Sequence, residues 1–211
     1  MRKPLKILLL LLSLLPLCGW GQFFDDFSDG DFTTNPTWSG DDSLFRVNPG
    51  FELQLNDTNA SSNNSTFLYT ESKAINKASW EFKFSLAFDP STSNYARFYI
   101  VSDQKNLLGS LNGYYVKIGG KTGTVDDISL YKQSGGSSSL VIDGRDGTAG
   151  KSPSGWIKVT RDSVGNWELF SDTSMSHSGY VLEGTANNSD YTTSSVSGVF
   201  CKYTSGRKYG F

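Results

Sequence analysis

Apolar and polar positions alternate along much of this chain. Between residues 79 and 88 every second position is apolar and the positions between them are mostly polar, and residues 51–56 repeat the pattern. A period of two predicts strands with one buried face. The same reasoning predicts strands at Phe67–Glu71, Ala96–Ser102, Tyr114–Ile118, Ile128–Gln133, Leu140–Asp143, Trp156–Arg161, Trp167–Phe170 and Val196–Tyr203.

The segments between these strands favour turns rather than helices. Clusters of Gly, Ser, Asn and Asp separate the strands, as in residues 56–65 and 134–139, and no stretch sustains a capped helical period. The dipeptide Gly165–Asn166 favours the left-handed conformations that a tight hairpin needs. Many short strands at regular spacing predict an all-β protein, an antiparallel two-sheet sandwich forming one domain.

The first 21 residues have the pattern of a secretory signal peptide. A basic start with Arg2, Lys3 and Lys6 precedes an apolar run, and Gly19 and Gly21 stand at the positions that favour cleavage before Gln22. Two alternatives are a membrane anchor, for which the apolar run is short, and a lipoprotein signal at Cys18. We therefore expect a signal peptide at 1–21, a sandwich domain at 22–211, and a secreted or outer-surface protein without a transmembrane span after cleavage.

The amino-acid composition excludes several classes of function. The 211 residues include 2 Cys and 1 His, which exclude a disulfide scaffold, a four-cysteine zinc site and metal centres with several histidines. The formal net charge is -2; since three of 19 basic residues and no acidic residue lie in the leader, cleavage leaves 16 basic against 21 acidic residues. That balance predicts no nucleic-acid partner. Cys201, in a strand-like run, is expected to be a buried thiol.

Four stretches resemble a known family. The segment "WIKVTRDSVGNWELFSD" resembles paired strands of concanavalin A-like, or laminin-G-like, jelly rolls. Together with "FFDDFSDGDFTTNPTWSGD", "ASWEFKFSLAFDPSTSNYARFYIVSD" and "GYYVKIGGKTGTVDDISLYKQSG" it resembles the amino-terminal module of secreted Bacteroidetes surface proteins. The resemblance implies a jelly roll followed by lamin-tail, sorting or other downstream domains. In the proteins it resembles, such modules close with another strand near the point where this chain stops. We therefore expect a fragment of a longer protein whose last strand is missing; the alternative is a sandwich with an unclosed edge.

The sequence gives no motif for catalysis. Laminarinase-type members of this superfamily carry a Glu-x-Asp-x-x-Glu strand, and none of the five glutamates begins one. Glu81 is the best single acid on a strand but has no partner two or five residues on. His177 lies in a loop-like stretch and is expected at the surface. We therefore predict no catalytic residues.

An acidic cluster near the mature amino terminus is a candidate calcium site. Asp25, Asp26, Asp29 and Asp31 supply oxygen ligands, with Gly30 permitting a tight turn. Their spacing does not fit an EF-hand, and a solvated acidic turn is the alternative.

Several aromatic and cationic residues are candidates for binding a polysaccharide or cell-surface glycan by stacking and hydrogen bonding. They are Trp38, Tyr95, Arg97, Tyr114, Tyr115 and Arg145. Because Tyr114 and Tyr115 are neighbours on a strand, one of them should point outward. The sequence thus predicts a non-catalytic recognition or adhesion module. The alternatives are a structural spacer domain and a glycan hydrolase of the laminarinase-like superfamily.

Overall fold

The computed structural model describes residues 23–121 and 125–211. The predicted signal peptide at 1–21 lies outside the described residues. Within the described ranges, no helix is long and apolar enough to cross a membrane.

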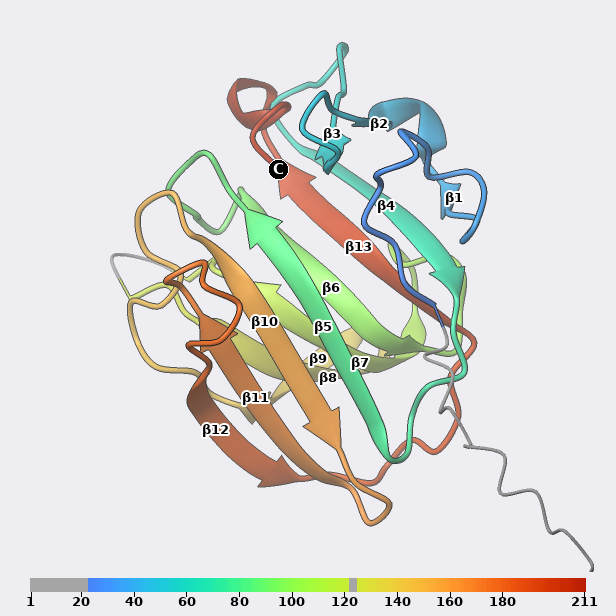
Figure 1. Ribbon diagram of the computed structural model, residues 1–211, viewed down its shortest axis with the longest axis vertical. Coiled ribbons are helices and arrows are strands. Elements are labelled where there is room, and N and C mark those ends of the chain that lie inside the picture. The colour runs from blue at the N-terminus through green and yellow to red at the C-terminus, as the bar shows by residue number, and fades with distance from the viewer. Residues whose placement is uncertain (1–22, 122–124) are drawn as a thin grey trace, which may run out of the picture.

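The protein is an all-β sandwich of two antiparallel sheets, which confirms the predicted fold class (Figure 1). The larger sheet has seven strands in the order β1-β4-β13-β6-β7-β8-β9. Their bounds are β1 (Ser39–Gly40), β4 (Asn64–Glu71), β6 (Tyr95–Ser102), β7 (Leu111–Ile118), β8 (Ile128–Gly135), β9 (Ser137–Ile142) and β13 (Val196–Tyr203).

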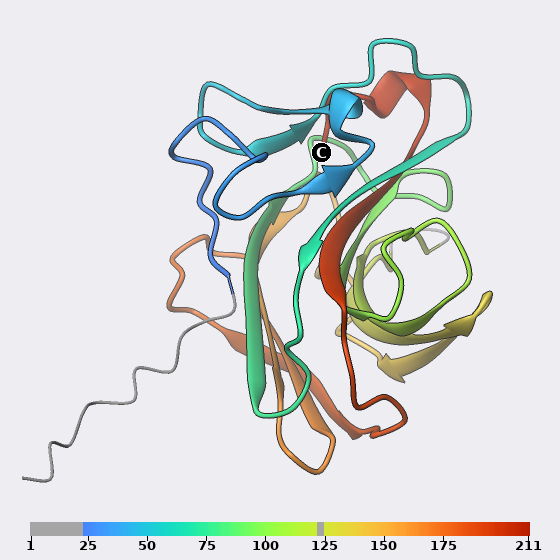
Figure 2. The same cartoon turned by 90° about the vertical axis from the view of Figure 1, so that its right-hand side faces the viewer.

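The second sheet has four strands in the order β12-β11-β10-β5 and covers one face of the larger sheet. Seen from the side in Figure 2, it lies to the left of the seven-stranded sheet. Its strands are β5 (Ala78–Ser85), β10 (Ser154–Arg161), β11 (Asn166–Asp172) and β12 (Val181–Asn187). A two-stranded ribbon, β2 (Phe45–Val47) with β3 (Leu53–Leu55), and two short 3₁₀ turns, η1 (Asp42–Leu44) and η2 (Ser205–Arg207), complete the described elements.

The predicted hairpin is confirmed as the β10–β11 pair. Arg161 lies opposite Trp167 at its closed end. Gly165 has a φ of 86°, in the left-handed region that glycine adopts without strain. The carboxylate of Asp162 accepts hydrogen bonds from the backbone N–H groups of Val164 and Asn166, both at 2.9 Å, and so holds the turn.

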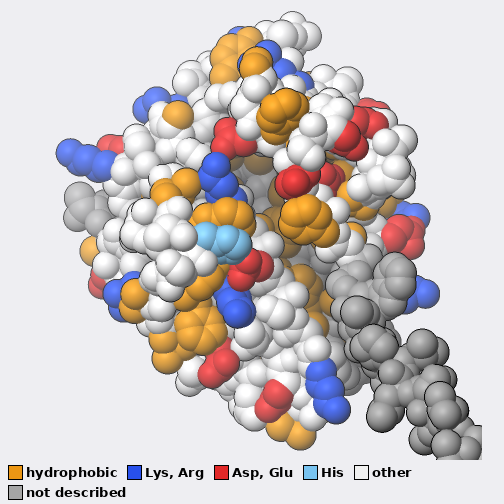
Figure 3. Space-filling model, viewed as in Figure 1, with side chains coloured by type: hydrophobic (Ala, Val, Ile, Leu, Met, Phe, Trp, Pro, Cys, Tyr) orange, Lys and Arg blue, Asp and Glu red, His pale blue; other side chains and the backbone are white. Residues whose placement is uncertain are grey.

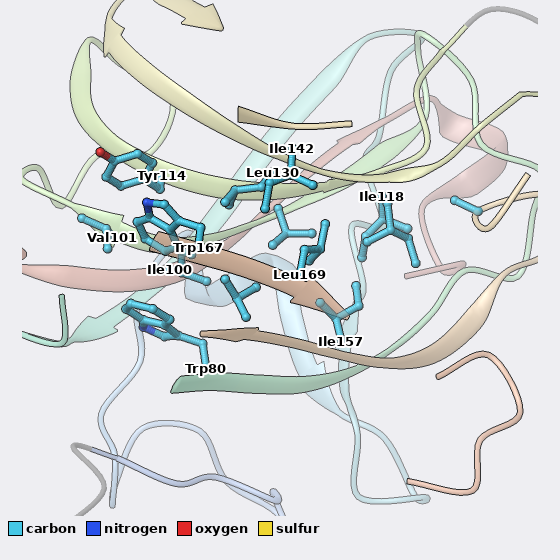
Figure 4. Packing of buried hydrophobic residues seen from close by; sticks show 14 of the residues in the cluster. Trp80, Ile100, Val101, Tyr114, Ile118, Leu130, Ile142, Ile157, Trp167 and Leu169 are labelled. Atoms are coloured by element: carbon cyan, nitrogen blue, oxygen red, sulfur yellow. The ribbon is translucent and has the colours of Figure 1, made fainter. Parts of the chain in front are cut away.

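The main core fills the space between the two sheets. Inward residues of both sheets meet there, and the rings of Trp80 and Trp167 stack with centroids 5.8 Å apart (Figure 4). Tyr114 packs on the other side of Trp167, with centroids 4.6 Å apart. Each large aromatic ring buries roughly 150–250 Å², so this cluster fastens β5 and β11 to β7.

A smaller core lies under the amino-terminal segment. The four-stranded sheet does not cover the inner face of β4 and β13, where the chain around β2 and β3 packs instead (Figure 1). Trp38, Leu55 and Leu68 are buried in this cluster. Cys201 is buried there too, as predicted, and burial raises the pKa of its thiol to about 12.

The last residues of the chain pack onto the sandwich. The carbonyl of Gly210 accepts a hydrogen bond from the N–H of Ala87 at 2.9 Å. The ring of Phe211 lies 4.8 Å from that of Phe88 and 6.1 Å from that of Tyr203. The carboxyl-terminal segment therefore joins the edge of the main core to the smaller one.

Candidate functional site

The outer face of the seven-stranded sheet carries a band of aromatic and cationic side chains, here called the aromatic face. Strand alternation turns these residues away from the other sheet, and they form a cluster separate from the main core. This face points away from the viewer in Figure 1. Its residues are Phe67 and Tyr69 on β4, Phe200 on β13, Tyr95, Arg97 and Tyr99 on β6, Tyr115 and Lys117 on β7, and Tyr131 and Gln133 on β8.

Strand register arranges the aromatic face in rows. Arg97 lies between Phe200 on one neighbouring strand and Lys117 on the other. In the next row Tyr115 lies between Tyr99 and Tyr131. Directly opposed side chains on one face are close enough to touch. Residues far apart in the sequence thus form one surface.

Arg97 lies at the centre of the aromatic face. The guanidinium carbon is 4.6 Å from the centroid of Tyr115 and 4.9 Å from that of Phe200, within the range of a cation–π interaction. Its Nη1 donates to the Tyr99 hydroxyl at 3.2 Å and its Nη2 to the Tyr95 hydroxyl at 3.3 Å. Its Nε is buried and has no hydrogen-bond partner among the described residues.

Lys117 places a second cation beside Arg97. Its Nζ lies 4.6 Å from the centroid of the Tyr95 ring and donates to the carbonyl of Gly120 at 3.0 Å. Burial lowers the pKa of this ammonium group, and the positive charge of Arg97 lowers it further. Both effects disfavour the charged form of the Lys117 side chain.

The floor of the aromatic face is rigidly braced. The Tyr99 hydroxyl donates to the side-chain carbonyl of Gln133 at 2.8 Å, and the Gln133 amide donates to the carbonyls of Gly109 and Gly135. Burial raises the pKa of Tyr99. Leu107, from the β6–β7 connection, packs into the same cluster. These contacts hold the fully buried residues in place beneath the more accessible ones.

The accessible part of this face consists of rings and cations. Phe67, Tyr69, Tyr95 and Tyr131 are half-buried, as are Arg97 and Lys117. The carboxylates at its margins are paired. Glu71 forms an ion pair with Lys105, with N and O 3.0 Å apart, and Asp127 forms one with Lys121. The face therefore offers ring surfaces, hydroxyl groups and two cations, and the described residues place no free pair of carboxylates on it.

Three of the six predicted glycan-binding residues meet on the aromatic face. Tyr95, Arg97 and Tyr115 contact one another there. Tyr115 points outward, as one of the two neighbours was expected to do, but Arg97 and Tyr131 cover it and leave it 2% exposed. It therefore supports the surface from below.

The other three lie elsewhere; the structure corrects the expected roles of Tyr114 and Trp38, while glycan binding by Arg145 stays a prediction. Tyr114 is fully buried against Trp167 in the main core. Trp38 is buried in the smaller core, where its Nε1 donates to Asp25 at 2.8 Å. Neither ring is free to stack on a sugar. Arg145 is exposed but forms an ion pair with the buried carboxylate of Glu183, with N and O 2.9 Å apart.

The four aspartates of the predicted calcium site lie in successive turns. The carboxylate of Asp25 accepts a hydrogen bond from the backbone N–H of Phe27. The carboxylates of Asp26 and Asp29 accept in the same way from the residues two positions later, Ser28 and Asp31. Hydrogen bonds from Thr33 and Thr34 lower the pKa of Asp31 to about 2. In residues 23–121 and 125–211, no three His, Cys, Asp or Glu side chains form a group that could hold a metal ion.

The opposite sheet carries a different cluster, which sequence reasoning treated as separate residues. On its outer face His177 stacks on Trp156 with centroids 3.8 Å apart, and its Nε2 lies 2.6 Å from Oε1 of Glu81 (Figure 3). His177 is at the surface, as predicted. Glu81, which had no acidic partner in the sequence, has a histidine partner in the fold.

Sequence reasoning missed most of the aromatic face. Tyr69, Tyr99, Lys117 and Tyr131 were not predicted to be functional residues. A signal was available, because the positions two apart in 95–99, 115–117 and 131–133 are all aromatic, cationic or amide side chains. Its meaning depends on strand order, which places these three segments side by side.

Comparison with known proteins supports the fold and leaves the family open. No family model matches the chain, and no curated protein matches it. Among solved structures it is similar to a legume lectin-like domain from Entamoeba histolytica, at 11% identity and TM-score 0.58, over 88% of this chain and 90% of that one. It is also similar to the Bacillus licheniformis β-glucanase, at 12% identity and TM-score 0.55, over 89% and 87%.

A third similar structure is the exoplasmic/lumenal domain of VIP36 in a Ca²⁺- and Man2-bound form. It shares 10% identity with a TM-score of 0.52, over 86% of this chain and 80% of that one. The protein therefore has the jelly-roll sandwich fold found in lectin-like domains and a glucanase. Identities this low show the fold alone, because one sandwich architecture serves many functions.

Proposed function

We propose that this protein is a secreted or outer-surface carbohydrate-recognition module, and that it binds glycan without cleaving it. One observation carries the proposal: four half-buried rings, Phe67, Tyr69, Tyr95 and Tyr131, share one braced sheet face with hydrogen-bonding groups between them. An aromatic ring offers an apolar surface to the C–H face of a sugar, and nearby polar groups fix its orientation.

The similar structures support this assignment at the level of carbohydrate-related jelly rolls. The non-catalytic part of the proposal rests on the site itself. Hydrolysis of a glycosidic bond requires two placed carboxyl groups. At the margins of the aromatic face Glu71 and Asp127 are each paired with a lysine, and the buried Asp126 accepts a backbone N–H. Glu81 lies on the other sheet, beside His177.

The test is a polysaccharide pull-down and glycan array with the purified chain, followed by titration of any glycan that binds. Replacing Tyr95 and Tyr131 together by alanine removes two accessible rings, and we expect affinity to fall by about tenfold or more. Tyr209→Ala is the matched control, because this exposed tyrosine lies beside β3, where its carbonyl accepts a hydrogen bond from Gln54, and is not part of the aromatic face.

Two results would overturn the proposal. Absence of binding to every glycan, with and without calcium, would favour the structural spacer. Release of reducing sugar from a β-glucan would favour the hydrolase.

Calcium binding by the Asp25–Asp31 segment stays a prediction that the same protein can test. Asp25 contacts Trp38, so an ion bound there should alter tryptophan fluorescence and raise the melting temperature relative to EDTA. The quadruple aspartate-to-asparagine variant should lose both effects. An unchanged melting temperature in calcium would contradict the prediction and leave the segment as a series of acidic turns.

A further inference from the structure

Two cations on the aromatic face lack ion-pair contact with a carboxylate in the part of the chain that the structure describes. Arg97 and Lys117 are directly opposed on β6 and β7, and neither forms an ion pair with any described residue. The carboxylates of Asp126 and Asp127 lie near enough to Lys117 to favour its charged form, but neither is in ion-pair contact with it. Asp126 accepts the backbone N–H of Lys121 at 2.7 Å, and Asp127 pairs with the Lys121 ammonium.

Partly buried cations in proteins are usually paired with a carboxylate, and Arg97 and Lys117 are not paired with any described one. Withdrawing a charge from water is costly unless a carboxylate and hydrogen bonds compensate for it. The buried carboxylate of Glu183 follows that rule through its pair with Arg145. Around Arg97 the compensation comes from rings and tyrosine hydroxyls. These partners stabilise the cation but do not neutralise it.

Arg97 also keeps unused hydrogen-bond donors. A guanidinium group has five N–H donors in a planar fork that matches a carboxylate or sulfate. Two of the five are used, by Tyr99 and Tyr95, and the N–H of Nε is buried, which leaves one further N–H on each of Nη1 and Nη2. Lys117 uses its ammonium group for one carbonyl, which leaves further donors beside Arg97. The pair is thus equipped to hold an anionic group above the ring of Tyr95.

Building on the proposed function, we propose that the aromatic face binds an acidic glycan whose carboxylate or sulfate groups contact Arg97 and Lys117. The sugar rings then lie on the neighbouring tyrosines, and the anionic substituent makes the direct ion-pair contact that neither cation has with a described carboxylate. Because the whole chain has a net charge of -2, binding of a polyanion would reflect this local site rather than general attraction.

The experiment compares three soluble polysaccharides of similar length by titration calorimetry: a neutral glucan, a polyuronate and a sulfated glucan. We expect the polyuronate or the sulfated glucan to bind at least about tenfold more tightly than the neutral one, with affinity falling as salt is added. The two acidic probes distinguish carboxylate from sulfate recognition.

Variants locate the site. Lys117→Met keeps the aliphatic stem and removes the charge, and we expect it to weaken acidic-glycan binding by about tenfold and to reduce the preference for acidic over neutral glycan. Arg97→Gln should weaken it at least as much, with circular dichroism checking that the fold is intact. Lys158→Met is the matched control, since Lys158 lies 5.9 Å from the Tyr180 ring on the opposite sheet.

The outcomes separate this inference from the proposed function. Equal affinity for neutral and acidic glycans, unchanged in Lys117→Met, would overturn the inference and leave glycan recognition standing. Equal binding of polyglutamate, or an equal loss in Lys158→Met, would also overturn it, because it would show attraction to any polyanion. Failure to bind any glycan would overturn both the proposed function and this inference.

Discussion

At the scale of single residues, cross-strand neighbours set the environment of each side chain on the aromatic face. Alternation correctly places Tyr114 and Tyr115 on opposite faces of β7, one against Trp167 and the other beneath Arg97. Their exposure was not predictable in the same way. Tyr115 is covered by residues of β6 and β8, and strand register, which no local pattern encodes, brings them there.

The buried carboxylate of Glu183 gives a prediction at this scale. It accepts hydrogen bonds from the backbone and side chain of Arg145 and from the Ser171 hydroxyl. Glu183→Ala leaves a buried hydroxyl and an N–H group without their acceptor, so we expect a loss of about 2 kcal/mol in the free energy of unfolding. Urea denaturation measures it. The exposed Glu168→Ala should cost under about 0.5 kcal/mol; equal losses would contradict this account.

The reactivity of Cys201 gives a second prediction. Burial raises the pKa of its thiol to about 12, so the thiolate that reacts with iodoacetamide is scarce at pH 8. Peptide mass spectrometry should find Cys201 unmodified in the folded protein and modified after unfolding in guanidinium chloride. Rapid labelling under native conditions would show that the smaller core opens locally.

At the scale of elements, alternation predicts most strands because most have one face against a core. β12 was missed for a physical reason. Its register against β11 shifts between Leu169 and Phe170, and its sequence interrupts alternation with Gly184 and the inward Glu183. It is also an edge strand, with Val181 and Leu182 exposed. A strand that turns a carboxylate inward and leaves two apolar residues exposed has no recognisable binary pattern.

The β10–β11 turn provides a prediction about an element. A Cβ on Gly165 would lie 2.8 Å from Cβ of Ser189 and 2.9 Å from the carbonyl of Asn188, and the φ of 86° adds strain. We expect Gly165→Ala to destabilise the fold by about 2–3 kcal/mol. Gly147→Ala has a similar φ of 84° but open space around it, so it should cost about 1 kcal/mol. Thermal unfolding of both variants gives the comparison; equal costs would show that the contact with residues 188–189 contributes nothing.

At the scale of the whole molecule, the two sheets present chemically different outer faces. The seven-stranded sheet presents rings with unpaired cations, whereas the four-stranded sheet presents a histidine–glutamate pair over Trp156 (Figure 3). Alternation in the sequence predicts strands with one apolar and one polar face. Which face of which sheet collects the candidate residues depends on the strand order, in which β13 lies between β4 and β6.

Five tyrosines, four in the seven-stranded sheet and Tyr180 just before β12, couple the stability of the molecule to alkaline pH. Burial raises the pKa of Tyr99, Tyr114, Tyr131, Tyr180 and Tyr203 above the ordinary value of 10.0. These groups stay protonated in the folded protein where they would ionise in the unfolded chain. Their contribution is therefore fully present below pH 10 and is lost as the pH rises above it.

We accordingly expect the free energy of unfolding to fall steeply above pH 10, by up to about 1.4 kcal/mol per pH unit for each tyrosine that ionises only on unfolding. Tyr203→Phe tests one contribution. It removes the hydrogen bond to Asp57 and lowers stability at neutral pH, but it should make the alkaline decline shallower. Tyr209→Phe, at an exposed tyrosine, should leave the slope unchanged. Guanidinium titrations at a series of pH values measure the slope, and a decline in Tyr203→Phe as steep as in the parent would show that Tyr203 does not contribute to it.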